Sequence, residues 1–176
     1  MEPTLALTNF YHKVKLKSRL VLIAFLSALL VVSKEALSVI PNVEVVTLLL
    51  LVYTKLLGFK TSIYITIIFT TIQAIIYPPG LWIITYYIIW PILVLVATLL
   101  FKFNVNSGVI AIWAAVFGLG FGAVDSFLLS FVYGFQAFIP IWVRGLPWDL
   151  VHGFSNYLTV LILYEPLRKN FEKLIF

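Results

Sequence analysis

Apolar stretches alternate with short breaks along the whole chain, and this pattern predicts six helices. The stretches cover residues 19–37, 43–57, 62–76, 81–100, 107–131 and 147–164. Spanning a bilayer takes about 20 residues, so most of these stretches suit membrane crossing. In lipid only helices and closed barrels satisfy the backbone, and these runs lack the alternation of a barrel. We therefore predict an all-α integral membrane protein with one domain (1–176), made of a basic segment (1–18), a bundle of six transmembrane helices (19–164) and a basic tail (165–176).

Composition supports this class of protein. Of the 176 residues, 62% are hydrophobic and only 11% are charged, whereas an ordinary soluble domain has about 25% charged residues. A soluble enzyme or a nucleic-acid-binding domain is therefore not expected. The chain has no cysteine, which excludes disulfides, thiolate metal sites and a thiol nucleophile.

The distribution of basic residues predicts the orientation. Placing both termini in the cytoplasm of a prokaryotic cell puts most Lys and Arg on the inner side, as expected for a multi-pass protein of the cell membrane. Only Lys34 and Arg144 then face outward. The net charge of +5 is explained by anionic headgroups rather than by nucleic acid. The inner residues are Lys13, Lys15, Lys17, Arg19, Lys55, Lys60, Lys102, Arg168, Lys169 and Lys173.

No catalytic motif is found. The chain has no GxxxxGK[ST], HExxH or GxSxG sequence, and two histidines are too few for a multi-histidine metal site. We predict no enzymatic activity and no cofactor. If the protein moves a solute, the energy comes from a gradient or from a partner chain.

Small residues predict close helix contacts in two places. Ala24 and Ala28 form a small-xxx-small pair, which suits either a partner helix or packing within the chain. A stripe of Ala and Gly along 107–131 leads to Asp125, which is therefore expected to face protein and not lipid. An acid within the membrane indicates a functional site, although a structural hydrogen bond is an equal alternative.

Polar residues on the last predicted helix recur with helical spacing. Asp149, His152 and Asn156 share one face near its outer end, and such a stripe must point into the bundle. Helix-dipole and interhelical hydrogen bonds are the alternatives. Glu44, which follows Asn42, could cap the second helix or accept a hydrogen bond from a ligand at the outer mouth.

Aromatic residues are concentrated toward the predicted outer side. Trp82 and Tyr86 suit an interfacial belt, whereas Trp90 lies too deep for one and is expected to pack or to line the floor of a cavity. Tyr77 opens the second outer loop (77–81). The third outer loop (132–146) is long and carries Arg144, which suits an anionic group or water, and Trp148 follows it.

These positions together resemble the substrate-binding S component of an energy-coupling factor (ECF) vitamin transporter. The resemblance covers nearly the whole chain and rests on the order and spacing of short motifs. One departure is the inner loop Gly58-Phe-Lys-Thr, where the family often has more glycine. The motifs are Ala24 with Ala28, Ile40-Pro41-Asn42-Val43-Glu44, Pro78-Pro79-Gly80, and Gly145-Leu-Pro-Trp-Asp149 with His152 and Asn156.

The resemblance implies a transport function shared with partner chains. Such a chain binds a micronutrient on the outer side, contacts a membrane scaffold subunit through the alanine pair, and topples in the bilayer when two ATPase subunits act. The expected binding residues are Glu44, Tyr77, Trp82, Tyr86, Trp90, Asp125, Arg144, Trp148, Asp149, His152 and Asn156.

The substrate is less well determined. We expect cobalamin, because the aromatic third outer loop suits a large ligand; folate, pantothenate and a queuosine precursor are alternatives. Two other classes remain open, namely an MreD-like membrane scaffold that binds no solute and a proton-coupled exporter in which Asp125 titrates.

Overall fold

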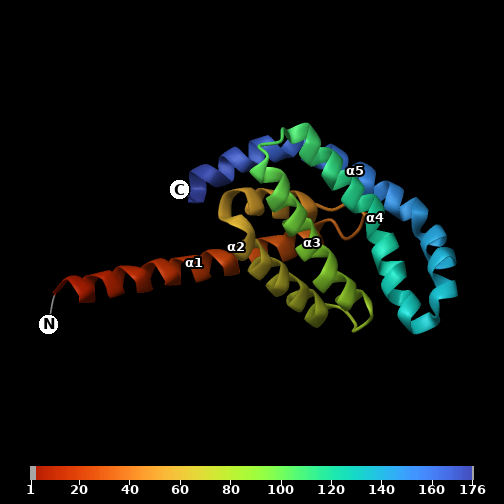
Figure 1. Cartoon of the computed structure of the whole chain (residues 1–176), viewed down its shortest axis with the longest axis horizontal. Coiled ribbons are helices and arrows are strands. Elements are labelled where there is room, and N and C mark those ends of the chain that lie inside the picture. The colour runs from red at the N-terminus through yellow and green to blue at the C-terminus, as the bar shows by residue number, and fades with distance from the viewer. Residues whose placement is uncertain (1–2, 176) are drawn as a thin grey trace.

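The computed structural model describes the backbone of residues 3–175 and the side chains of residues 18–175. The described chain is helical throughout, with short connections (Figure 1). The elements in order are α1 (Pro3–Ala36), α2 (Val46–Ile76), α3 (Trp82–Lys102), α4 (Ser107–Tyr133), the 3-10 turn η1 (Phe135–Ala137) and α5 (Phe138–Ile175).

The described residues therefore form five α-helices, and the predicted count of six transmembrane helices is not supported. The second and third predicted helices belong to one element, α2, which is interrupted at Gly58 with φ 77° and ψ 172°. Figure 1 shows α2 changing direction sharply along its length. A positive φ favours glycine because it has no Cβ. The half before Gly58, residues 46–57, is about 18 Å long at the helical rise, which is short of the roughly 30 Å hydrocarbon core.

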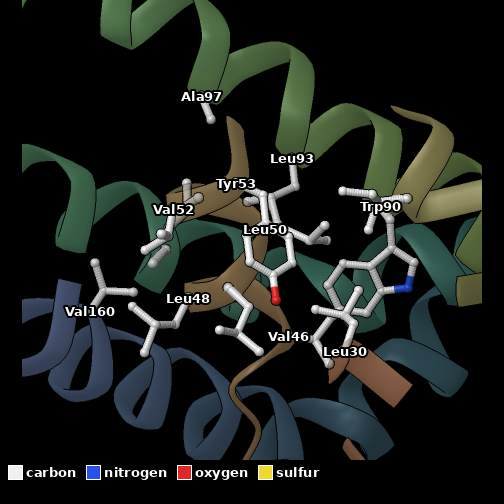
Figure 2. Packing of buried hydrophobic residues seen from close by; sticks show 14 of the residues in the cluster. Leu30, Val46, Leu48, Leu50, Val52, Tyr53, Trp90, Leu93, Ala97 and Val160 are labelled. Carbon is white, nitrogen blue, oxygen red and sulfur yellow. The ribbon is translucent and has the colours of Figure 1, made fainter. Parts of the chain in front are cut away.

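The first half of α2 forms the centre of the core. All residues from Val46 to Thr54 are buried, as expected for a helix that is apolar on every side. Figure 2 shows side chains of α1, α3 and α5 around this segment, including Leu30, Leu93 and Val160. A segment too short to cross the bilayer alone is thus covered by its neighbours.

Within the part of the chain that the structure describes, three helices are long and apolar enough to cross a membrane, namely α2, α3 and α4. Large apolar side chains on the outside of the described bundle support a lipid environment, for example Ile75, Ile112 and Phe154, which are 80%, 57% and 66% exposed. Water would penalise such a surface, whereas lipid tails accommodate it.

Helices α4 and α5 cross with almost no side chain between them. A Cβ added to Gly118 would lie 2.8 Å from the N and Cα atoms of Gly153 and from the carbonyl carbon of His152. A Cβ at Gly122 would overlap the Asp149 carboxylate. The small-residue stripe of α4 is thus a contact surface within this chain.

The ends of two helices differ from the prediction. The expected outer loop 132–146 is a turn at Gly134 (φ 90°), followed by η1 and the start of α5 at Phe138. Pro140 lies in the first turn of α5, where a missing N–H breaks no helical hydrogen bond. Helix α1 begins at Pro3 rather than near Arg19, and α5 continues through the predicted tail to Ile175. The side chains of Lys13, Lys15 and Lys17 lie outside the described residues.

Candidate functional site

A cavity of about 270 Å³ lies between the α1–α2 connection, the end of α1 and side chains of α2, α3, α4 and α5. Five residues predicted to bind substrate line it, although they come from distant parts of the sequence: Glu44, Tyr77, Tyr86, Trp90 and His152. The cavity is therefore the principal candidate for a ligand site.

The α1–α2 connection forms one wall of the cavity and is held against α5. Glu44 Oε1 lies 3.3 Å from His152 Nε2, and Ser155 Oγ donates to the carbonyl oxygen of Asn42 at 3.0 Å. Asn42 has a left-handed φ of 59°, which asparagine tolerates better than most residues. These contacts place a carboxylate and an imidazole side by side at the cavity.

Glu44 also stabilises the start of α2. Its Oε2 accepts a hydrogen bond from the backbone N of Thr47 at 2.9 Å, which satisfies one of the free donors of the first turn. Burial alone would raise the pKa of Glu44, but the hydrogen bond and charge of His152 and the hydrogen bonds with Thr47 outweigh burial and lower this pKa. Glu44 is thus an ionised group at neutral pH, and its side chain is 14% exposed.

A second polar cluster fixes the mouth of the cavity. Glu35 accepts hydrogen bonds from Tyr77 Oη at 2.6 Å and from Gln73 Nε2 at 3.1 Å. Lys34 pairs with the same carboxylate at 3.1 Å, and its Nζ lies 3.9 Å from the centre of the Tyr77 ring. The end of α1 is thereby joined to the end of α2, and the charge of Lys34 is balanced.

Aromatic rings form the opposite wall. Tyr86 and Trp90 of α3 pack edge to face at 5.6 Å between ring centres, and both contact Phe69 of α2 and Phe121 of α4 at 5.8–6.4 Å. The Nε1 of Trp90 has no hydrogen-bond partner, although the residue is only 3% exposed. This donor is a buried unsatisfied polar group that is closed off from the cavity.

The structure places the other predicted binding residues outside the cavity lining. Trp82 packs edge to face against the Tyr77 and Tyr86 rings, and Asp125 accepts a hydrogen bond from Thr85 Oγ1 at 2.6 Å. Asp149 Oδ1 accepts a hydrogen bond from the backbone N of Gly122. Asn156 donates to Thr47 Oγ1 at 3.2 Å. Two further residues are exposed on α5 away from the lining, Arg144 and Trp148.

Sequence reasoning missed two kinds of lining residue. Phe69 and Phe121 lie within long apolar runs. In such runs the sequence does not distinguish an aromatic residue that lines a cavity from one that faces lipid. For Lys34, the sequence predicts only a position on the outer side of the membrane. Its position next to Glu35, at the end of the first apolar stretch, was a signal that could have placed it at a mouth.

Ala24 and Ala28 both lie on the exposed face of α1, whereas Ile23, Leu26 and Ser27 face the core. The pair is therefore not packed within the described chain. The small-xxx-small surface is open to lipid or to another helix.

No protein-family model, curated protein or solved structure matches this chain. Within the described residues, no group of three or more His, Asp or Glu side chains is placed to hold a metal ion. The assignment of function thus depends on the cavity and its surroundings.

Proposed function

We propose that this chain is the substrate-binding S component of an ECF-type importer. In this role it captures a micronutrient at the outer face of a prokaryotic cell membrane. A scaffold subunit and two ATPase subunits then drive its release inward. The observation that carries the proposal is the cavity, because five of the residues that the resemblance associates with binding meet there.

The distribution of charge supports an outward-facing cavity. Basic residues gather at the opposite end of the bundle, where Arg19 donates to Thr61 Oγ1 at 2.7 Å and Lys55 lies over the Phe101 ring. The positive-inside rule assigns such an end to the cytoplasm. Gly58, three residues after Lys55, then lies near the inner surface.

The exposed alanine pair supports the proposed contact with a scaffold subunit. In lipid, helices associate through close packing of small residues, and Ala24 with Ala28 offers such a surface on the outside of α1. In the proposal this face contacts the scaffold subunit. Energy for transport is supplied by the partner chains, in line with the lack of a phosphate-binding loop in this sequence.

The test separates binding from transport. The protein is purified, the small molecule that co-purifies with it is identified by mass spectrometry, and uptake of that molecule is measured in cells that express the partner subunits. We expect Ala24→Leu with Ala28→Leu to leave binding within about twofold and to abolish uptake, because the added methyl groups hold the helices apart. Val116→Phe, an exposed change of similar bulk on α4, is the matched control and should leave uptake intact.

Two outcomes would contradict the proposal. Uptake that survives both alanine substitutions would show that this face of α1 does not contact the scaffold subunit. A purified protein that carries no small molecule, and whose thermal stability does not respond to a panel of vitamins, would favour a membrane scaffold of the MreD kind.

A further inference from the structure

The hairpin made by the end of α4, η1 and the start of α5 has a tip without charge. Residues 128–143, which we name the α4–α5 tip, contain no Asp, Glu, Lys, Arg or His. An apolar surface of this kind is unfavourable in water and marks contact with lipid or with protein. The tip residues that are more than half exposed are Phe131, Val132, Tyr133, Phe135, Ile139 and Val143.

The tip is held together by its own aromatic rings. Phe127 contacts Phe131 along α4 and Phe138 across on α5, at 5.2 and 6.0 Å between ring centres. Phe138 stacks on Trp142 at 5.9 Å. In Figure 1 the turn from α4 into α5 is clear of the other helices, and no residue of the tip lines the cavity. The exposed surface is therefore a fixed feature of the hairpin and does not serve as a cover of the cavity.

Hydrogen bonds between helices show how far the tip extends. Helix α3 begins at Trp82 on this side and is about 31 Å long at the helical rise, close to the roughly 30 Å hydrocarbon core. Thr85 of α3 bonds to Asp125 of the antiparallel α4, so Leu128 lies roughly level with Trp82. From there α4 continues to Tyr133, which is about 8 Å further. The headgroup layer on one side of a bilayer is about 5–8 Å thick, so the tip matches the depth of that layer.

A cation lies at the base of the tip. Asp149 of α5 bonds to Gly122 of the antiparallel α4, and this pairing puts Arg144 roughly level with Phe127. The Arg144 side chain is exposed and forms no salt bridge among the described residues. Arginine pairs well with phosphate oxygens, and Trp and Tyr concentrate at the headgroup level. The charge next to the tip thus complements a lipid phosphate.

The apolar surface of the tip also continues the lipid-facing side of its two helices. Leu119 and Phe127 on α4, and Leu150 and Phe154 on α5, are all exposed below the tip. A bilayer that covers these side chains reaches the tip with only Arg144 as a charged group at the boundary. Water over the tip would instead need a boundary across a continuous apolar surface.

We propose that the α4–α5 tip is embedded in the headgroup layer of the membrane leaflet at the cavity end of the bundle, with Arg144 facing the lipid phosphates. The partner of this surface is the lipid itself. The inference goes beyond the proposed function, because it does not depend on what the cavity binds. An embedded tip sets the depth at which α4 and α5 lie in the membrane.

The test measures the depth of the tip in a bilayer. The chain has no cysteine, so one introduced cysteine carries a nitroxide spin label at a chosen position. The protein is placed in nanodiscs of phosphatidylcholine with phosphatidylglycerol. Collision rates are measured with oxygen, which concentrates in hydrocarbon, and with a nickel chelate, which concentrates in water. Val132→Cys and Ile139→Cys report on the tip.

Two reference positions give the scale. Val116→Cys lies on the exposed side of α4, about 14 Å from the start of that helix and thus near the middle of the hydrocarbon. Pro79→Cys lies in the exposed α2–α3 connection. We expect the nickel collision rate at both tip positions to be at least about threefold below that at Pro79 and above that at Val116.

A charged variant tests the cause. Phe131→Asp with Phe135→Asp adds two carboxylates to the tip, which should move it toward water and raise the nickel collision rate of a label at Ile139 about threefold. The control is Phe103→Asp, because Phe103 is as exposed as these residues but lies in the α3–α4 connection at the opposite end. It should leave the label unchanged, and circular dichroism should report an intact helical fold in each variant.

Three results would overturn the inference. Nickel collision rates at the tip equal to that at Pro79 would place the tip in water. Labels that are immobilised and shielded from both reagents would show that protein, from a second copy or from the same chain, covers it. An unchanged label in the double aspartate variant would show that the apolar rings do not hold the tip in lipid. None of these results bears on the proposed function, which is tested by the co-purified molecule and by uptake.

Discussion

The crossing of α4 and α5 at Gly118 gives the sharpest prediction of stability. In Gly118→Ala the new Cβ would lie 2.8 Å from three backbone atoms of Gly153 and His152. Carbon atoms pack at about 3.5–4.0 Å, so the helices must separate by roughly 0.7–1.2 Å. Backbone atoms cannot rotate away as the end of a flexible side chain can. The strain is therefore shared by the whole crossing.

The expected cost follows from two opposing effects. Overpacking of this kind costs about 1–3 kcal/mol, while alanine in place of glycine favours a helix by about 1 kcal/mol. The net destabilisation is then about 0–2 kcal/mol relative to the unchanged protein, and about 1–3 kcal/mol relative to a variant that gains only the helix preference. At about 2–4 °C per kcal/mol for a chain of this length, Tm should fall by up to about 8 °C.

The matched control is Gly120→Ala, two residues along the same helix. A Cβ at Gly120 meets nothing within 4 Å, so only the helix preference remains and Tm should stay level or rise. Both variants are measured by thermal denaturation in one detergent, followed by intrinsic fluorescence. A Gly118→Ala variant as stable as Gly120→Ala would show that the crossing relaxes freely, and would refute the reasoning.

Two further predictions concern polar contacts. Glu44 has a pKa below its ordinary value of 4.5, so its ionised form stabilises the fold fully above that pH, and the stabilisation is lost as the pH falls through the lowered pKa. Thermal denaturation from pH 7 to pH 3 should show this loss, and Glu44→Gln should remove that part of the pH dependence; an identical profile in both proteins would contradict it. Thr85→Val removes the hydrogen bond to Asp125 that joins α3 to α4 and should destabilise the protein by about 1–2 kcal/mol. Thr98→Val is its control because Thr98 bonds only to the carbonyl of Val94 in its own helix, and equal Tm values for the two variants would argue against a structural role of the Asp125 contact.

Much of the helical content could be predicted because apolar runs of this length leave the backbone few alternatives. The break at Gly58 was also visible in the sequence, but its consequence was not. Whether a glycine ends a helix between two spans or bends one element depends on packing around the first half of α2. The start of α5 was misjudged because Pro140, Gly145 and Pro147 together suggested a loop, whereas each is tolerated within the helix.

The candidate site was predictable only in part. Carboxylate, histidine and deep tryptophan stood out as unusual in apolar surroundings, and Glu44, His152 and Trp90 do meet. Their meeting depends on contacts such as Glu44 with His152, 108 residues apart, which no local pattern specifies. Asp125, Arg144 and Trp148 were equally unusual in the sequence, but they do not line the cavity.

The attachment of the α1–α2 connection to α5 has a consequence for kinetics. One wall of the cavity is fastened to α5 by the Glu44–His152 and Asn42–Ser155 contacts, each worth on the order of 1 kcal/mol in net terms. Detachment of this short segment therefore needs far less energy than separation of the helices. Ser155 holds this segment but does not line the cavity. Removing its hydroxyl can therefore change the lifetime of a bound molecule without any change in the atoms that recognise it.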